Sequence, residues 1–151
     1  MIGDTVIRSS SEILSAIEVE AVNLIRRSRA RSSELANRDA QMRADTVYNI
    51  LVSYNGNVNL RLSVIASAMA CTMRTLEREF LARFSETMHS FQERTRLAHA
   101  EALLTDHPHL KLMTIAAELG YKRESELHRF FRRQKGISPR AFSKTRIGTR
   151  E

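Results

Sequence analysis

The sequence lacks a hydrophobic run that could cross a membrane. A transmembrane helix shows in a sequence as about 18 or more consecutive apolar residues, and the 151 residues contain no such run. The N-terminus also lacks the basic and then apolar pattern of a secretion signal, since Asp4 stands where that signal is positively charged. We therefore expect a cytoplasmic protein that has no membrane partner.

Cysteine is nearly absent as well, since Cys71 is the only one. No disulfide can form within the chain, which agrees with a reducing compartment. Cys71 falls at the expected turn of the first motif described below. There, packing as a small, half-buried residue is favoured over redox sensing.

The sequence also lacks the short motifs of common enzymes. It has no glycine-rich phosphate loop, no metalloprotease histidine pair and no nucleophile elbow. His107 and His109 flank Pro108 and could hold a stray metal ion, but no thiolate or carboxylate cluster completes a site. We therefore predict no enzymatic activity, no cofactor and no metal centre.

Basic residues, in contrast, are in excess. The chain carries 24 lysines and arginines against 17 aspartates and glutamates, which gives a net charge of +7. This surplus favours a polyanionic partner, because cationic side chains that neutralise phosphates release counterions. The charge alone does not separate DNA from RNA or from an anionic membrane. Hydrophobic residues make up 42% of the chain, which is enough for a packed core.

Two blocks of the chain share one layout, in which a short apolar helix, a tight turn and a basic amphipathic helix follow one another. The first block covers residues 62–80 and the second covers residues 113–131. Each is typical of a helix-turn-helix, the unit that places its second helix in the major groove of DNA. No segment has the pattern of a strand. We expect an all-α, homeodomain-like fold with two helix-turn-helix subdomains, at about 62–84 and 112–133.

The subdomains are expected to be bridged by a long helix over about residues 88–104. Its apolar stripe is predicted at Met88, Phe91, Thr95, Ala98 and Ala102. Pro108 disfavours helix at the preceding residue and predicts a loop over residues 106–109. Ser138 and Pro139 predict the N-cap and first position of a last helix.

Residues 1–44 form a separate N-terminal helical segment. Its apolar face recurs at three- and four-residue steps, at Leu14, Ile17, Ala21 and Leu24, after the candidate caps Ser9, Ser10 and Ser11. The basic stretch 26–31 is either the solvated end of this helix or a linker, and its arginines could contact phosphates. Docking on its own domain and dimerisation both remain open for this segment.

A second helix is expected from Ala44 to about Tyr54, ended by residues 55–57, because asparagine and glycine accept a left-handed backbone. The DNA-binding domain is expected to cover residues 45–146, followed by a tail over residues 147–151.

In the first block, one face of the second helix should pack and the opposite face should read DNA. The inward set is Met73, Leu76 and Phe80, which face Ile65, Ala66 and Met69, with Thr72 as the N-cap. Arg74 and Arg78 could each contact a guanine edge through two hydrogen bonds. Glu77 could accept from a cytosine amino group, although pairing with a neighbouring arginine is slightly favoured.

In the second block, the inward set is Leu127, Phe130 and Phe131, which face Ile115, Ala116 and Leu119. Ser125 and Arg129 are the best candidates for base contacts. Glu124 is better suited to stabilise the positive end of its helix, and His128 either reads a base or is an exposed polar residue. Lys122 and Arg123 suit phosphate contacts. The complete predicted DNA-binding set is Thr72, Arg74, Thr75, Glu77, Arg78, Lys122, Arg123, Glu124, Ser125, His128 and Arg129.

Residues 72–80 resemble the first recognition helix of the AraC/XylS family of bacterial transcription regulators. The second block resembles the signature of that family at Ile115, Ala116, Gly120, Tyr121, Ser125, Arg129, Phe131 and residues 136–142. The resemblance covers about residues 45–145 and implies two lobes bridged by one long helix. It also implies that the DNA-bound protein recruits RNA polymerase and activates transcription.

The sequence departs from the family pattern at several positions. Ala70 and Ser85 stand where the family usually has glycine, which predicts slightly altered turns in the first lobe. Lys122, Leu127 and Lys135 replace a capping serine, an aromatic residue and an apolar residue. The 44 residues ahead of the domain are too few for the sensor barrel of many members. We therefore expect a small stand-alone regulator, or one cut short, controlled by its abundance or by a partner.

These observations predict a sequence-specific transcription regulator whose two recognition helices enter successive major grooves of double-stranded DNA. Because the lobes differ, a monomer should prefer an asymmetric site of about 20 base pairs. Further expected partners are RNA polymerase and, through residues 1–44, a second copy or another protein. The alternative is a co-regulator that keeps the fold and neutralises another regulator. The retained arginines Arg74, Arg78 and Arg129 argue against it, whereas the acidic Glu77, Glu124 and Glu126 keep it open.

Overall fold

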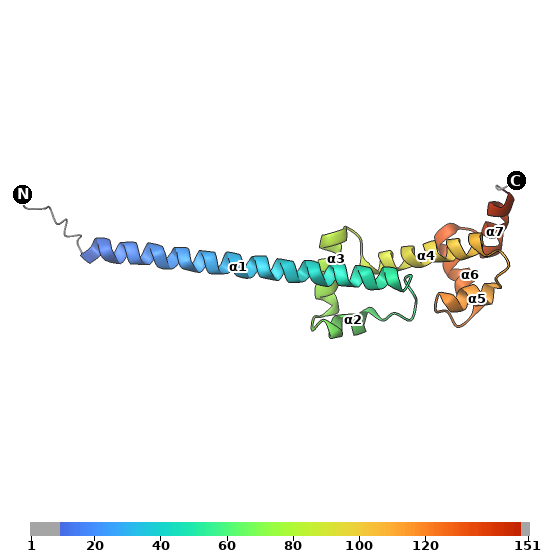
Figure 1. The fold of residues 1–151 in the computed structure, drawn as a ribbon, viewed down its shortest axis with the longest axis horizontal. Helices are drawn as coiled ribbons and strands as arrows, with labels where there is room; N and C mark the ends of the chain where they lie inside the picture. Colours follow the sequence, from blue (N-terminus) through green and yellow to red (C-terminus); the bar gives the residue numbers. More distant parts are fainter. Residues whose placement is uncertain (1–9, 149–151) are drawn as a thin grey trace, which may run out of the picture. The chain divides into compact units, whose positions relative to one another are not determined.

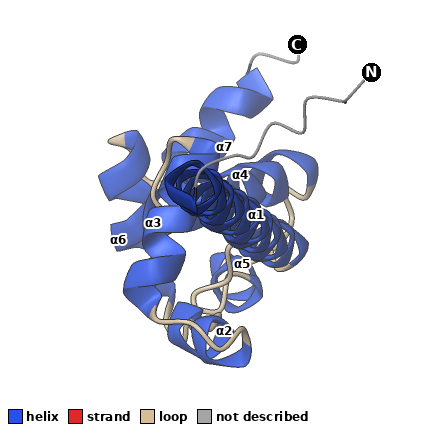
Figure 2. Cartoon of the chain, turned by 90° about the vertical axis from the view of Figure 1, so that its left-hand side faces the viewer, coloured by secondary structure: helices blue, strands red, loops and turns tan. Residues whose placement is uncertain are grey.

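The computed structural model describes residues 10–148, and the side chains of residues 10–21 and of Ile25 lie outside the description. The elements are α1 (Ser10–Ser53), α2 (Leu62–Ala68), α3 (Met73–Phe84), α4 (Met88–Asp106), α5 (Leu112–Glu118), α6 (Glu124–Lys135) and α7 (Pro139–Gly148). Within residues 10–148 only helices, turns and loops occur (Figure 2). The predicted all-α fold is confirmed.

The chain divides into two compact units, residues 1–39 and residues 40–151. In the first unit, the described part is the helix that starts at Ser10, and its described side chains from Arg26 to Asp39 are all exposed. The predicted apolar face at Leu14, Ile17 and Ala21, the cap at Ser9 and most of the tail at 147–151 fall outside the described residues. Those predictions stay predictions.

The two N-terminal helices expected from the sequence are one continuous helix, α1, so the prediction of a separate helix starting at Ala44 is wrong. Residues 26–45 contain no glycine and no proline, and arginine, alanine and glutamate are good helix formers. Glu34 and Arg38 are also spaced at four residues, in the order that supports a helix. The polar residues 26–31 therefore belong to the helix and do not form a linker. The end of the helix is as predicted, because Asn55 and Gly56 have φ values of 52° and 62°.

The first lobe packs the last turns of α1 onto α2, α3 and the start of α4. Its core is formed by Val47, Leu51, Ile65, Ala66, Leu76, Phe80, Met88 and Phe91. The inward residues predicted for this block all lie in or against this core. Cys71 is half-buried against it, and its thiol faces the Ala66 carbonyl at 3.6 Å. The packing interpretation of Cys71 is therefore confirmed.

The second lobe packs the end of α4 onto α5, α6 and α7. Its core contains Leu104, Leu112, Ile115, Ala116, Leu119, Leu127, Phe131 and Phe142. The rings of Phe131 and Phe142 meet edge to face with centroids 5.3 Å apart. Ser138 caps α7 as predicted, since its hydroxyl accepts from the Ala141 amide at 3.2 Å.

The bridging helix α4 connects the lobes, with α2 and α3 at one end and α5, α6 and α7 at the other (Figure 1). Its buried face differs from the predicted stripe, because Ala98 and Ala102 are exposed. The buried face instead follows four-residue steps at Met88, Gln92, Arg96, Ala100 and Leu104. The two polar members of this face were not expected inside the protein, and their role is described below.

Candidate nucleic-acid interface

The second helix of the first motif, α3, presents an outward face that is basic. It begins after Thr72, whose hydroxyl accepts from the Thr75 amide at 3.1 Å and contacts the Thr75 hydroxyl at 2.9 Å. Both threonines therefore hold the start of the helix, as predicted for Thr72. Arg74 and Arg78 are exposed on the side opposite the buried Leu76. This face is free to meet a polyanion.

Glu77 is exposed beside these arginines. The described residues provide it with neither an ion pair nor a hydrogen bond, so the predicted pairing with a neighbouring arginine is not seen. Its carboxylate is available as an acceptor on the same surface. A contact with a cytosine amino group stays a prediction.

The second helix of the second motif, α6, has an equivalent face. Ser125 and Arg129 are exposed, whereas Leu127 and Phe131 are fully buried on the other side. Arg132 continues this exposed row at the next three-residue step. Arg132 was not among the predicted DNA-binding residues, although its spacing from Ser125 and Arg129 could have identified it.

The start of α6 is fixed by a carboxylate rather than by a capping serine. The Glu126 side chain accepts from the backbone amides of Lys122 and Arg123, each at 3.0 Å. The departure at Lys122 is thereby offset, and both basic side chains remain exposed. Glu126 consequently has a structural role and no longer supports the co-regulator alternative.

Glu124 and His128 lie one turn apart on α6, with 3.5 Å between the carboxylate and the imidazole Nε2. Glu124 also stands in the first turn, where a negative charge stabilises the helix. Its predicted stabilising role therefore has two physical grounds. His128 keeps 38% of its side chain exposed next to this carboxylate.

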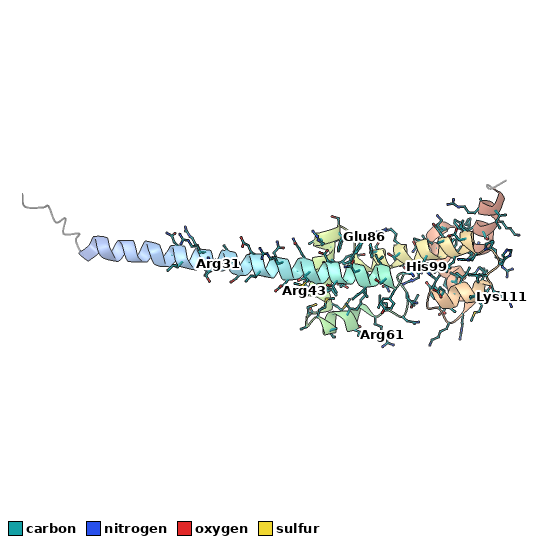
Figure 3. The ribbon with its side chains drawn as sticks, in the orientation of Figure 1. Arg31, Arg43, Arg61, Glu86, His99 and Lys111 are labelled. Carbon is teal, nitrogen blue, oxygen red and sulfur yellow. The ribbon has the colours of Figure 1, made fainter. Side chains whose placement is uncertain are left out.

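Two further basic residues flank the motifs. Arg61 directly precedes α2, and Lys111 directly precedes α5, so each motif has one cation at the same place. Both side chains are exposed, and Figure 3 labels them among the side chains of the two lobes. Neither residue was among the predicted DNA-binding residues, although an alignment of the two blocks places them at the same position.

The basic residues of the lobes differ in whether they form ion pairs. Several on other faces pair with acids, in the pairs Arg43–Glu79, Arg83–Asp45, Arg94–Glu86, Arg133–Glu93 and Lys135–Glu101. On the outward faces of α3 and α6, by contrast, Arg74, Arg78, Arg129 and Arg132 form no ion pair with any described residue. The outward faces of the two recognition helices therefore carry cations that are not neutralised internally, and so do the flanking positions Arg61, Lys111, Lys122 and Arg123.

One of these ion pairs anchors α3 itself. Arg43 on α1 donates from Nε to the Glu79 carboxylate at 2.9 Å. Hydrogen bonding from Arg43 lowers the pKa of Glu79 below its ordinary value. The pair ties the recognition helix to the last turns of α1.

A set of contacts that we call the brace joins the two lobes. It consists of the loop 56–60, Gln92 and Arg96 on α4, and residues 118–121. The Val58 amide donates to the Leu119 carbonyl at 3.1 Å, and the Asn57 amide nitrogen Nδ2 donates to the Glu118 carbonyl at 3.3 Å. The loop that follows α1 therefore contacts the turn of the second motif directly.

The polar residues buried on α4 complete the brace. Gln92 donates to the Asn57 carbonyl at 3.0 Å, and Arg96 donates from Nε to the Gly56 carbonyl at 2.9 Å. The Arg96 guanidinium also lies 5.1 Å from the Phe130 ring centre and 3.3 Å from the Tyr121 hydroxyl. Burial raises the pKa of Tyr121 above its ordinary value, against the opposing effect of Arg96. Recognition helices in both lobes are thus held to one bridging helix.

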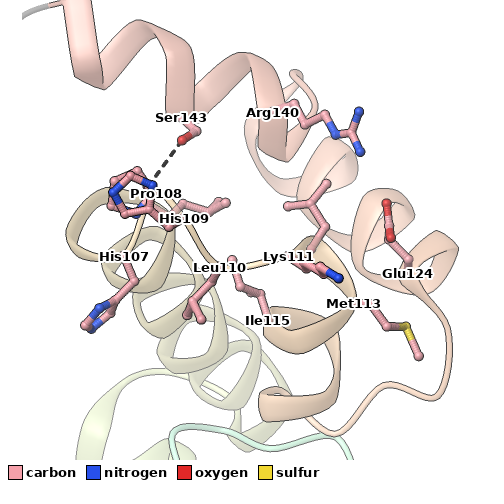
Figure 4. Close-up of a pocket in the computed structure, with 12 residues that line it drawn as sticks. His107, Pro108, His109, Leu110, Lys111, Met113, Ile115, Glu124, Arg140 and Ser143 are labelled. Carbon is pink, nitrogen blue, oxygen red and sulfur yellow. Dashed lines mark hydrogen bonds between the residues drawn. The ribbon is translucent and has the colours of Figure 1, made fainter.

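A shallow pocket of about 410 Å³ lies beside the second lobe (Figure 4). His107, Lys111, Glu124 and Arg140 are among its lining residues, and Ser143 on α7 donates to the Leu104 carbonyl behind it. No group of three or more histidine, cysteine or acidic side chains within the described part of the chain could hold a metal ion. The pocket instead adds two cations, Lys111 and Arg140, beside the start of α5 and α7.

A search of the described residues found no helix with the length and apolar character needed to span a membrane. No curated protein matches the sequence. Solved structures share the fold, among them the following three. The C-terminal domain of AraT, a response regulator from Geobacillus stearothermophilus, aligns with a TM-score of 0.64 and 19% identity, over 69% of this chain and 85% of that one.

The C-terminal domain of the two-component response regulator YesN from Fusobacterium nucleatum gives a TM-score of 0.59 and 20% identity, over 66% of this chain and 95% of that one. A probable AraC family transcriptional regulator from Rhodopseudomonas palustris gives a TM-score of 0.55 and 18% identity, over 69% of this chain and 96% of that one. A family model described as a helix-turn-helix domain, of the AraC type, matches residues 65–145, more than half of the chain. The chain therefore belongs to the AraC-type helix-turn-helix family of DNA-binding transcription regulators, which are not enzymes.

Proposed function

We propose that the protein activates transcription by placing α3 and α6 in successive major grooves on one side of a DNA duplex. The observation that carries this proposal is that the outward faces of both helices expose arginines that form no ion pair with a described residue. In Figure 2 both helices also fall on the same side of α4. Successive grooves are about 34 Å apart, so the lobes either match that spacing or bend the DNA.

The roles of individual residues follow from their positions. Arg74 and Arg78 on α3, and Arg129 on α6, make the base contacts, because a guanidinium can donate two hydrogen bonds to one guanine. Arg61 and Lys111 contact phosphates at the edges of the two motifs. The asymmetric pair of helices selects an asymmetric site of about 20 base pairs. In this role the protein acts in the cytoplasm.

The test is selection of bound fragments from a genomic DNA library. The wild-type protein is expected to recover one bipartite asymmetric sequence. Arg78→Ala should relax one half and Arg129→Ala the other, each at a cost of about 1–3 kcal/mol for the preferred site. Arg83→Ala and Arg133→Ala are matched controls, because these arginines lie on the same two helices but pair with Asp45 and Glu93.

Equal loss of binding to the selected site and to random DNA would refute the assignment of Arg78 and Arg129 as base-reading residues. Sequence-blind binding by the wild-type protein would instead support the co-regulator alternative. Activation is tested by transcription in vitro from a promoter that carries the selected site, with purified bacterial RNA polymerase. A rise in transcript supports recruitment of the polymerase, whereas a fall identifies a repressor.

A further inference from the structure

The pocket of about 410 Å³ beside the second lobe, which we call the cationic pocket, is lined by two basic side chains without an acidic partner. Lys111 and Arg140 are both exposed, and neither side chain forms an ion pair or a hydrogen bond with any described residue. Other basic residues of this lobe are paired, as Lys135 is with Glu101 at 2.8 Å. The charges of Lys111 and Arg140 are therefore left for a ligand.

The two cations of the cationic pocket come from different elements. Lys111 directly precedes α5, and Arg140 is the second residue of α7. In Figure 4 both side chains extend toward the side of the pocket on which Glu124 and α6 lie, whereas the His107 imidazole extends toward the other side. Two segments that are far apart in the sequence therefore bring a cation each to one side of one pocket.

The floor of the cationic pocket belongs to the core of the second lobe. Leu104, Leu112 and Ile115 line it and are 3%, 9% and 1% exposed. The Ser143 hydroxyl on α7 donates to the Leu104 carbonyl at 3.3 Å and ties α7 to α4. Because a packed core resists deformation, the backbone segments that carry the two cations are in place before a ligand binds. Such preorganisation lowers the cost of binding.

The charge of the lining selects an anion. Its one acid is Glu124, whose carboxylate lies 3.5 Å from the imidazole of His128. The excess of cations favours a negatively charged ligand. A guanidinium donates two parallel hydrogen bonds to phosphate oxygens, and an ammonium binds them as a compact charge. The cationic pocket therefore has the chemistry of a phosphate site.

The cationic pocket is continuous with the surface expected to bind DNA. Lys111 stands at the same place in the second motif as Arg61 does in the first, and Glu124 is the first residue of the recognition helix α6. Arg140, by contrast, lies outside both motifs. Proteins that read bases in a groove take much of their hold from phosphates and sugars. A DNA backbone phosphate beside the groove that receives α6 is therefore the phosphate expected next to this pocket.

We propose that the cationic pocket binds one backbone phosphate of DNA at the flank of the sequence contacted by α6, with Arg140 and Lys111 as the two donors. The inference rests on the proposed function, because it takes α6 to lie in a major groove. It extends the DNA contact to α7, an element outside both motifs. The contact contributes affinity and carries no sequence preference.

The first test is the slope of log affinity against log salt, measured on random-sequence DNA and on the selected site. The double variant Lys111→Ala, Arg140→Ala should lower the slope by about 0.9 on both, the value for one phosphate. A drop of about 1.8 would mean that the two cations neutralise separate phosphates, and an unchanged slope would mean that they neutralise none. Either result would overturn the proposal.

The matched control is the double variant Lys135→Ala, Arg146→Ala. It removes the same two residue types from the same lobe, but Lys135 pairs with Glu101 and Arg146 lies over the Phe142 ring, 5.5 Å from its centre. Its slope should equal that of the wild-type protein. An equal drop for both double variants would show that net charge alone sets the slope, and would overturn the assignment of the pocket.

The second test locates the phosphate with uncharged methylphosphonate linkages, placed one at a time through the selected site and its flanks. One linkage at the flank contacted by the second lobe should weaken binding of the wild-type protein and of the control variant. The same linkage should have no further effect on the double variant Lys111→Ala, Arg140→Ala. If every linkage weakens the wild-type protein and this double variant equally, the pocket does not bind a backbone phosphate.

Inorganic phosphate is the probe for the other source of the same chemistry. It is titrated without DNA at constant ionic strength, while the side-chain resonances of Lys111 and Arg140 are followed by NMR. Saturation by inorganic phosphate, together with no linkage-specific effect in DNA, would identify a free phosphate as the ligand and overturn the proposal. If the wild-type protein selects no sequence, the proposed function fails, whereas the salt slopes on random DNA still test the pocket.

Discussion

Gly120 is the position where one added methyl group should disturb the brace between the lobes. Its φ is 91°, and a Cβ atom placed there would lie 2.2 Å from Asn57 Oδ1. That oxygen accepts from the Asn59 amide at 2.9 Å, and Nδ2 of the same side chain donates to the Glu118 carbonyl at 3.3 Å. Gly120→Ala must therefore displace Asn57 as well as strain the backbone.

The expected loss of unfolding free energy is about 2–4 kcal/mol. Left-handed backbone costs a residue with a Cβ about 1–2 kcal/mol, and each displaced hydrogen bond adds about 0.5–1.5 kcal/mol. Reduced freedom of the unfolded chain offsets about 0.4–1 kcal/mol. Gly136 provides a matched control, because its φ is 77° but a Cβ there would meet nothing within 4 Å. Gly136→Ala should cost only about 1 kcal/mol.

Urea unfolding of both variants measures this difference. A double-mutant cycle with Asn57→Ala then isolates the contact, because without the Asn57 side chain the close neighbour that remains is Asn59 Nδ2 at 3.1 Å, the end of a flexible side chain. The double variant should be at least about 1 kcal/mol more stable than the sum of the single losses predicts. Equal losses for Gly120→Ala and Gly136→Ala, together with additive effects in the cycle, would refute the role assigned to this contact.

Three further predictions concern the turns, the acid range and the missed arginine. Ala70 and Ser85 have φ values of 53° and 56°, so Ala70→Gly and Ser85→Gly should each stabilise the protein by about 0.5–1 kcal/mol in urea unfolding. As a control, Ala98→Gly in the middle of α4 should destabilise it by about 1 kcal/mol. Hydrogen bonds from Arg43 and Arg94 lower the pKa values of Glu79 and Glu86. The ionised carboxylates should therefore stabilise the fold fully above pH 4.5, and this stabilisation should be lost as the pH falls through the lowered pKa values. Glu79→Gln should flatten the acid limb of a curve of unfolding free energy against pH, and an unchanged limb would contradict the role of the Arg43–Glu79 pair. Arg132→Ala should lower the slope of log affinity against log salt by about one, while Arg133→Ala, which removes one partner of Glu93, should leave it unchanged.

Local signals in the sequence were sufficient to predict the two helix-turn-helix motifs. Caps such as Thr72 and Ser138 satisfy backbone amides within three residues, and the apolar spacing of Leu76, Phe80, Leu127 and Phe131 matches the helical period. Both kinds of signal are short-range, so the residues themselves reveal them. Ala70 and Ser85 both take a left-handed backbone although neither is glycine. The expectation that these turns are slightly altered from the family pattern stays a prediction.

Long-range polar contacts were not visible in the sequence. Gln92 and Arg96 have the composition of a solvated face, yet they are 6% and 7% exposed because they meet a loop about 35–40 residues earlier in the chain. Periodicity assigned α4 the wrong stripe for that reason. The continuity of α1 was missed for another reason, since a polar stretch was treated as an interruption although it lacks a helix breaker. The DNA contacts of the predicted site residues stay predictions.

The brace also bears on how this protein could be given a new target sequence. Apart from the Tyr121 hydroxyl, its acceptors are main-chain carbonyls, those of Gly56, Asn57, Glu118 and Leu119, which every amino acid supplies. The side chains that donate to them, on Asn57, Gln92 and Arg96, lie away from the outward faces of α3 and α6. The residues that join the two lobes are therefore different from the residues that are expected to contact DNA bases. A library that randomises positions 74, 77, 78, 125, 129 and 132 should yield readers of new sequences whose half-sites keep the original spacing.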